Sequence, residues 1–435
     1  MNFQNNISKY LFGYGLCVFP LFLLIGPLIS EIFLISIIFF SFYYIFKLNK
    51  SYFYSNRYTI FFIIFYLSVL ISTLLNFYNF DYAISGIMYF RLPLFALASW
   101  FVFENYKLFS KKIVIFYIFF FSIIIIDSLI QYITGENIIG YNILKSRVSS
   151  FFGEELILGG FLTRVLPIFL LFLVLGGMFH EKKNNIYFAL ILSLVVVIIY
   201  LSGERSSFFL LILFFSTLFF TTKYLRKFII IITLFSVCFS FAISKIPSSD
   251  NLNPAKRMFQ KSYLQIIGRG EEQYEKTKKK FFNKFYAFSH DHHGHYLLSY
   301  QIFKDHPVIG TGPKGFRYLC RNKIYILENN DGCSTHPHNT YMQILTSNGI
   351  VGFSLITFSF FFFLFEIFKY RKKLNQKKEF DKYLISQNIA LAAIFVNLWP
   401  LIPTGNFFNN WLSMIYFYPI SFYLYLKFRN EKKIS

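Results

Sequence analysis

The sequence predicts an all-α integral membrane protein of about twelve transmembrane helices with one large, mostly helical outer loop. Of the 435 residues, 55% are hydrophobic, and apolar runs of about 20 residues, each long enough to cross a bilayer, recur along the chain. Lys and Arg gather in every second connection between these runs. A soluble core does not need repeated uninterrupted runs of this length, so these observations exclude a soluble protein.

Twelve apolar runs are assigned as spans, with boundaries good to about four residues. In chain order they are Tyr10–Ser30, Ile32–Phe46, Tyr58–Leu75, Tyr82–Phe103, Ile113–Ile133, Leu156–Leu175, Ile186–Leu201, Ser206–Thr221, Phe228–Ile246, Gly349–Phe368, Leu384–Ile402 and Trp411–Leu426. The chain then divides into residues 1–246 with spans one to nine, residues 247–348 as the large loop, and residues 349–435 with spans ten to twelve and a tail.

The net charge of +22 suggests nucleic acid at first sight, but its distribution indicates a membrane topology. Basic residues follow every even-numbered span, for example at Lys47, Lys111, Lys182, Lys223, Arg371 and Arg429. The opposite short loops, 76–81 and 403–410, carry no Lys or Arg. By the positive-inside rule this pattern predicts an even number of spans with both termini in the cytoplasm.

The large loop therefore lies on the outer face, where we expect it to form a mostly helical cap over the membrane core. Its segment 296–303 has apolar residues at helical spacing, which predicts an amphipathic helix that stops near Pro307. A turn at Gly310-Thr311-Gly312-Pro313 follows. Cys320 and Cys333 lie in this loop, and an oxidising periplasmic face favours a disulfide between them over two unpaired thiols.

Three ionisable residues fall inside predicted spans, where charges are costly and mark functional candidates. Arg91, Asp127 and Arg164 each lie roughly 10–13 Å below the outer end of their helix at about 1.5 Å per residue. Their similar depth allows them to meet. Two interpretations stay open: an Arg–Asp–Arg cluster that offsets its own desolvation, or a site with spare positive charge.

Two further arginines lie at the outer surface beside serines. Arg147 precedes the segment that contains Glu154 and Glu155, and Arg205 stands at the tight turn before span eight. Guanidinium groups match phosphate oxygens bidentately, and helix N-termini supply further N–H groups for anions. A pyrophosphate at the outer membrane surface is a ligand that such a site would suit, although a single arginine at a membrane face is usually an interfacial anchor.

His338 stands where the large loop meets span ten. It precedes a helical run at Thr340–Asn348, which Asn339 or Thr340 is suited to cap. Gly349 and Gly352 are expected on one helix face, where they allow close packing. The near-neutral pKa of histidine suits a general base that takes a proton from a hydroxyl. The alternative is a capping or structural histidine.

The segment His290-Asp291-His292-His293-Gly294-His295 invites a metal interpretation. No second cluster with zinc spacing accompanies it, so we expect solvated histidines and no metal site. No Gly-rich phosphate loop followed by Lys occurs either, so ATP use is not indicated.

Three segments together resemble the O-antigen ligase and polymerase superfamily of bacterial envelope proteins. They are Arg205-Ser206-Ser207 at a helix start, His306-Pro307-x-x-Gly310-x-Gly312-x-x-Gly315-Phe316, and His336-Pro337-His338-Asn339 with Gly349 and Gly352. The resemblance implies a metal-independent and cofactor-independent glycosyltransferase of the bacterial inner membrane. Such an enzyme takes a glycan from undecaprenyl pyrophosphate on the periplasmic side, and a ligase attaches it to a sugar hydroxyl of lipid A–core.

The resemblance also implies roles for individual residues. His338 would be the base that activates the acceptor hydroxyl, and Arg205 would bind the pyrophosphate and stabilise its leaving charge. Arg147, Arg91 and Arg164 would add to the pyrophosphate site. Asp127 and Asn339 would support these residues. Glu154 or Glu155 would contact sugar hydroxyls or favour a helix N-terminus.

Other functions stay open at this point. Polymerisation of O-antigen or another surface polysaccharide uses the same donor and shares the histidine and arginine features. Transfer of the glycan to a protein hydroxyl is a third possibility. In a different class, a transporter of anionic lipid or polymer would line its path with Arg91, Asp127 and Arg164. Internal repeats would favour that function, and none is evident.

Overall fold

Helices account for nearly all of the ordered structure. The computed structural model describes residues 6–106, 108–180, 182–246, 258–259, 290–325, 332–377 and 379–432. Within these ranges it contains no β-strand, only two isolated bridges in the loop after Thr134. The predicted all-helical class is therefore confirmed.

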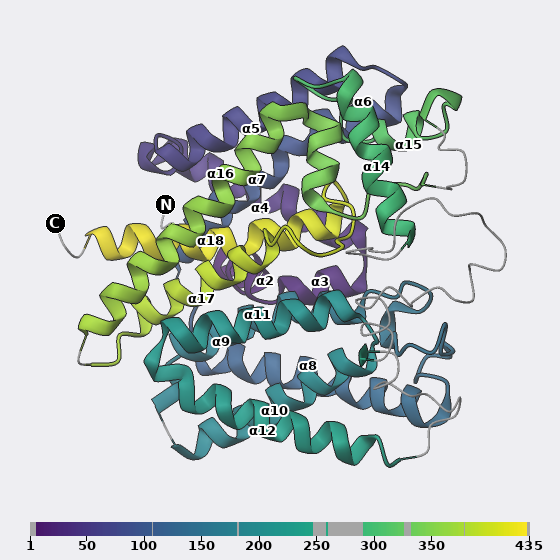
Figure 1. Ribbon diagram of the computed structural model, residues 1–435. Helices are drawn as coiled ribbons and strands as arrows, with labels where there is room; N and C mark the ends of the chain where they lie inside the picture. Colours follow the sequence, from purple (N-terminus) through teal and green to yellow (C-terminus); the bar gives the residue numbers. More distant parts are fainter. Residues whose placement is uncertain are drawn as a thin grey trace.

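Each of the twelve predicted spans overlaps a helical segment (Figure 1). The helices are α1 (Asn6–Ser8), α2 (Gly15–Cys17), α3 (Phe19–Ile25), α4 (Pro27–Lys47), α5 (Arg57–Leu75), α6 (Phe80–Ile87), α7 (Arg91–Asn105), α8 (Lys111–Thr134), α9 (Leu158–Leu175), α10 (Lys182–Leu201), α11 (Arg205–Thr221), α12 (Arg226–Ile243), α14 (His290–Asp305), α15 (Gly315–Leu319), α16 (Thr340–Gln376), α17 (Lys382–Asn397) and α18 (Asn410–Lys432). Seven helical segments among the described residues are long and apolar enough to cross a membrane, and α10 and α11 include shorter apolar stretches. A count of twelve crossings stays a prediction.

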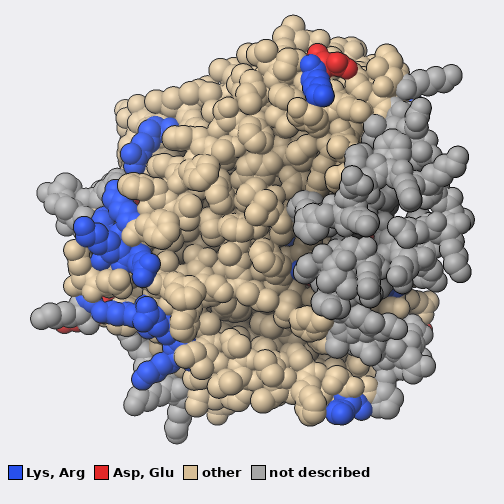
Figure 2. Space-filling model, in the orientation of Figure 1, with Lys and Arg blue, Asp and Glu red and all other residues tan. Residues whose placement is uncertain are grey.

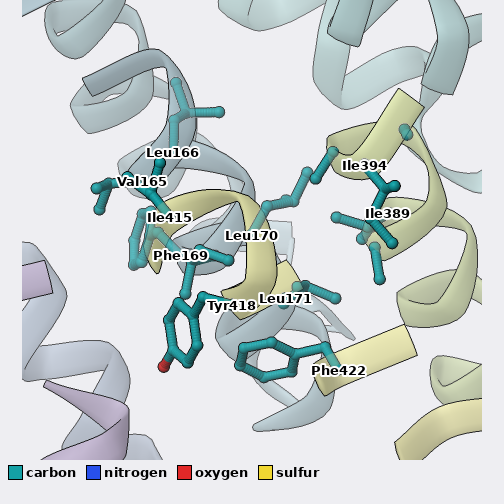
Figure 3. Close-up of a cluster of buried hydrophobic side chains, with 14 of the residues drawn as sticks. Val165, Leu166, Phe169, Leu170, Leu171, Ile389, Ile394, Ile415, Tyr418 and Phe422 are labelled. Carbon is teal, nitrogen blue, oxygen red and sulfur yellow. The ribbon is translucent and has the colours of Figure 1, made fainter. Parts of the chain in front are cut away.

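The helix α9 lies at the centre of the molecule. Its entire apolar window is buried inside the structure, as expected for a helix that is apolar on all sides. Figure 3 shows its side chains meeting those of α17 and α18; the labelled members are Val165, Leu166, Phe169, Leu170 and Leu171 of α9, Ile389 and Ile394 of α17, and Ile415, Tyr418 and Phe422 of α18. A charge on α9 is consequently shielded from both lipid and bulk water.

The peripheral helices instead turn large apolar side chains outward. Phe39 on α4, Phe241 on α12 and Phe365 on α16 are each more than half exposed. Contiguous apolar surface of this kind fits a lipid environment. On the face drawn in Figure 2, Lys and Arg gather mainly along one edge, on the side where the C-terminus lies in Figure 1. The protein is a membrane protein with an asymmetric charge distribution.

The junction between the large loop and the tenth predicted span differs from the expected smooth helix face. The helix α16 is kinked at Gly349, whose φ is 60° and ψ −158°. The N–H groups of Ile350 and Val351 donate to the carbonyls of Pro307 and Val308, at 2.8 and 3.3 Å. Gly349 is thus required for its backbone conformation and for contact with this loop, and the expectation that it shares one packing face with Gly352 is wrong.

The described part of the large loop forms a small cap with its own apolar cluster. Leu298, Ile302, Phe316, Cys320 and Tyr325 are buried together. The predicted amphipathic helix is present as α14, which ends at Asp305, just before Pro307. Cys320 and Cys333 form the predicted disulfide, with Cα atoms 5.0 Å apart. Residues 260–289 of this loop lie outside the described residues.

Candidate functional site

His338 is held at the start of α16 by its backbone and by the next residue. Its φ is 56°, and its carbonyl accepts a hydrogen bond of 2.8 Å from the N–H of Thr404. Asn339 caps α16, because its Oδ1 accepts from the N–H groups of Tyr341 and Met342 at 2.9 and 3.1 Å. The capping role predicted for Asn339 is therefore confirmed.

The other end of the Asn339 amide fixes this corner to the loop before α18. Its Nδ2 donates to the carbonyls of Pro400 and Ile402, at 2.8 and 3.0 Å. Thr340 also contacts this loop, since its Oγ1 is 3.0 Å from that of Thr404. The histidine is thus positioned by two segments that are about sixty residues apart in sequence.

Four imidazole rings, those of His292, His295, His336 and His338, lie together here and form what we call the histidine corner. The ring centroid of His338 lies 4.0 Å from that of His336, 5.3 Å from that of His295 and 5.6 Å from that of His292. His295 is only 8% exposed, and its Nδ1 is 2.8 Å from the carbonyl of Gly332. The expectation of solvated histidines in this segment is wrong for His292 and His295, because their spacing of three residues places both on the side of α14 that faces His338.

Within the ranges that the structure describes, no group of three or more His, Cys, Asp or Glu side chains is arranged to hold a metal ion.

Burial keeps His336 and His338 neutral. Burial, followed by the neighbouring His336, His295 and His292, lowers the pKa of His338 to about 3. Burial also lowers the pKa of His336 to about 4. A neutral imidazole has a free lone pair, so His338 is in the protonation state that a general base requires.

A second polar cluster forms where α9 and α11 begin. Glu204, which sequence reasoning did not single out, accepts hydrogen bonds from the N–H groups of Gly159 and Gly160 at 2.8 and 2.9 Å. It also accepts from the Ser207 hydroxyl at 2.9 Å and forms a 3.2 Å ion pair with Arg147. The available signal was a carboxylate directly before a helix start that carries Arg205.

Two of the three guanidinium nitrogens of Arg147 make polar contacts with the protein. Its Nε donates to the Ser202 carbonyl at 2.8 Å, and its Nη2 donates to the Leu156 carbonyl at 2.7 Å in addition to the Glu204 contact. Its side chain is 16% exposed. These contacts hold the long loop between α8 and α9 against the turn before α11.

Arg164 is a buried cation on the central helix. It is 8% exposed, and its Nη1 donates to the Gly160 carbonyl at 2.9 Å. Its guanidinium carbon lies 5.7 Å from the centre of the Tyr416 ring. Its Nε is buried without a hydrogen-bond partner, and no ion pair to a described carboxylate satisfies it. A buried charge of this kind is costly unless a ligand compensates it.

Three of the four predicted arginines, Arg147, Arg164 and Arg205, lie near Glu204, and we call this group the arginine cluster. Arg147 is paired with it, Arg205 follows it as the first residue of α11 and is exposed, and Arg164 lies one turn beyond Gly160. Glu154 and Glu155 are exposed and precede the start of α9, whose first N–H groups are taken by Glu204. The roles predicted for Glu154 and Glu155 stay predictions.

The expected meeting of Arg91, Asp127 and Arg164 does not occur. Arg91 forms a bidentate pair with Glu31, at 3.0 and 2.8 Å, and lines a separate pocket of about 350 Å³. Asp127 accepts instead from the Ser150 hydroxyl at 2.5 Å and from the N–H of Ile138 at 2.9 Å. Equal depth does not bring side chains together when their helices face different neighbours.

The loop of residues 398–404 contacts both the histidine corner and α11, the helix that begins at Arg205. The Tyr341 hydroxyl donates to the Leu398 carbonyl at 2.6 Å on the histidine side. On the other side, the Trp399 ring lies 6.4 Å from that of Phe209, four residues after Arg205 on α11.

Comparison with known families gives a match, which covers part of the chain. Residues 186–357 match the O-antigen ligase family, a segment that contains Arg205, His292, His295 and His338. No curated protein sequence matches the chain.

Proposed function

We propose that this chain, which resembles the O-antigen ligase superfamily through residues 186–357, is a ligase of the bacterial inner membrane. It would transfer a glycan from undecaprenyl pyrophosphate to a sugar hydroxyl of lipid A–core, without a metal ion or cofactor. The site would face the periplasm, with both termini in the cytoplasm. The asymmetric placement of basic residues supports this orientation.

The observation that carries the proposal is the presence of two unusual groups, Arg164 on α9 and His338 at the start of α16. Arg164 is a cation on the wholly buried helix α9 without an ion-pair partner among the described carboxylates, which favours a polyanionic ligand. His338 is held neutral by burial, which favours proton abstraction. Anion binding combined with a base suits a reaction with a phosphate leaving group.

The proposed chemistry assigns one step to each group. The acceptor hydroxyl oxygen attacks the anomeric carbon of the donor glycan, and the bond from that carbon to the phosphate oxygen breaks. His338 receives the hydroxyl proton, and the diphosphate leaves with the bonding electrons. Arg205 and Arg164 stabilise the charge that develops on the leaving group.

Donor binding would also strengthen the base. In the donor-free protein the pKa of His338 is about 3, well below the value near 7 at which a base works best. A diphosphate brought near the histidines adds negative charge, which favours the imidazolium and raises its pKa. His338 would then become an effective base only after the donor has bound.

A reconstituted assay tests the proposal and separates it from its alternatives. Purified protein receives the polyprenyl-linked glycan with or without lipid A–core, in the presence and absence of a chelator, and products are separated by size. Glycan on lipid A–core, unaffected by the chelator, supports the ligase. Longer glycans on the polyprenyl carrier in both tubes identify a polymerase. Transfer to neither acceptor contradicts both and leaves a protein acceptor or a transporter.

A further inference from the structure

Glu204 has no role in the proposed transfer step, yet it has four polar partners, at Gly159, Gly160, Ser207 and Arg147. We infer that Glu204 is a positioning residue that fixes the arginines of the donor site, and that Arg147 acts with it instead of binding phosphate. This inference rests on the proposed function.

The contacts of Glu204 join three separate segments. Oε1 accepts from Gly159 and Oε2 from Gly160, so the carboxylate closes the N-terminus of α9. The residue itself stands at the N-cap position of α11, and it bonds Ser207 in the first turn of that helix. Its Oε1 pairs with Arg147 on the loop between α8 and α9. A single side chain thereby fixes the two helix starts relative to each other.

Both proposed donor ligands depend on this connection. Arg205 is the residue that directly follows Glu204, so its backbone position is set by the same turn. Arg164 bonds the carbonyl of Gly160, whose N–H is held by Glu204. A Cβ added at Gly160 would lie 3.2 Å from Glu204 Oε2 and 3.4 Å from Arg164 Nη1, so the two side chains approach the same point. Movement of Glu204 would displace both cations.

Arg147 has the contacts of a tether. Its Nε and Nη2 are directed at two backbone carbonyls, and its charge is compensated by Glu204. To bind a phosphate through Nε or Nη2 it would have to release the loop that it holds. Arg164 needs no such release, because its Nε is buried without a partner. The donor therefore meets Arg164 and Arg205, and the Arg147–Glu204 pair stays intact during turnover.

The test is a double-mutant cycle with Glu204→Gln and Arg147→Gln, read out as the KM for donor, the KM for acceptor and kcat. Loss of one charge-assisted contact is worth about tenfold or more, so each single variant should raise the donor KM about tenfold. The acceptor KM should stay within about twofold, because the histidine corner is untouched. The double variant should be no worse than either single one, since both remove the same pair. Glu136→Gln, an exposed carboxylate on the same loop as Arg147, is the control.

Results that contradict the role of Glu204 can be distinguished from results that contradict the proposed function. Additive effects in the double variant would show that Arg147 contacts the donor itself and would overturn the inference. An unchanged donor KM in Glu204→Gln, or an equal change in donor KM, acceptor KM and kcat, would also overturn it. The wild type, the two single variants and the double variant are also compared without turnover, by measuring their affinity for undecaprenyl diphosphate in detergent through fluorescence quenching. A wild-type protein that binds this lipid but transfers no glycan would instead contradict the proposed function.

Discussion

Gly349→Ala should destabilise the protein and disconnect the histidine corner from the cap. With φ at 60° and ψ at −158°, Gly349 occupies a region that is essentially restricted to glycine and costs another residue about 1–3 kcal/mol. The added Cβ would also overlap the Val308 carbonyl and lie 2.7 Å from the Ile309 nitrogen. Because these are backbone atoms, they cannot move aside as a flexible side chain would.

The size of this destabilisation follows from the hydrogen bonds that would be lost if α16 moved to relieve the clash. Separating α16 from the 307–309 segment would remove the hydrogen bonds from Ile350 and Val351, each worth about 0.5–1.5 kcal/mol. Together with the conformational cost, the free energy of unfolding should fall by about 2–6 kcal/mol. Gly405→Ala is the matched control, since its Cβ would meet only the flexible Leu412 side chain at 3.2 Å.

The assay is reversible unfolding in mixed detergent micelles, followed by tryptophan fluorescence. Glycan transfer is measured in parallel at a temperature where both variants are folded. A Gly349→Ala protein as stable as Gly405→Ala would contradict this prediction, because it would show that the kink tolerates a side chain.

Three further predictions concern the site and the cap. Arg164→Leu should abolish donor binding and raise the stability of the protein, because it removes a buried charge that has no ion pair. Arg164→Lys should bind the donor only in part, since Lys lacks the planar guanidinium group. A loss of stability in Arg164→Leu would contradict this prediction. Between about pH 6.5 and pH 4, kcat/KM should stay level, because burial holds the pKa of His338 near 3. A decrease in kcat/KM with an apparent pKa of about 6.5 would instead indicate a solvated base. Over the same range, stability should decrease, since the unfolded histidines take up protons that the folded protein excludes. Cys333→Ser should lower the stability of the cap by about 3 kcal/mol, visible as earlier proteolysis, and a reductant should have the same effect on the wild type only.

Features that depend on local sequence were predictable. The helix that ends before Pro307 follows from apolar spacing and a helix breaker. Asn339 caps α16 because a short polar side chain before a helical run suits that position. The Cys320–Cys333 bridge follows from two cysteines in one outer loop. In each case the relevant interaction lies within a few residues or one loop.

Features that depend on how each helix is rotated about its own axis in the bundle could not be predicted from the sequence. Sequence gives the depth of Arg91 in its span, but not that α7 faces Glu31 on α4 rather than Asp127 on α8. The meeting of His292 and His295 with His338 likewise requires the fold of the cap. Glu204 escaped notice because its partners at Gly159 and Gly160 are about 45 residues away in sequence.

Single-turnover transfer by His338→Ala, with the donor already bound, tests the role of His338 most directly. We predict that the transfer rate falls by about 100-fold or more, as expected for loss of a general base. Affinity for the polyprenyl-diphosphate donor should stay within about twofold, since its ligands are Arg164 and Arg205. A variant that transfers glycan at a rate near wild type, or that loses donor binding and transfer together, would contradict the assignment of His338 as the base.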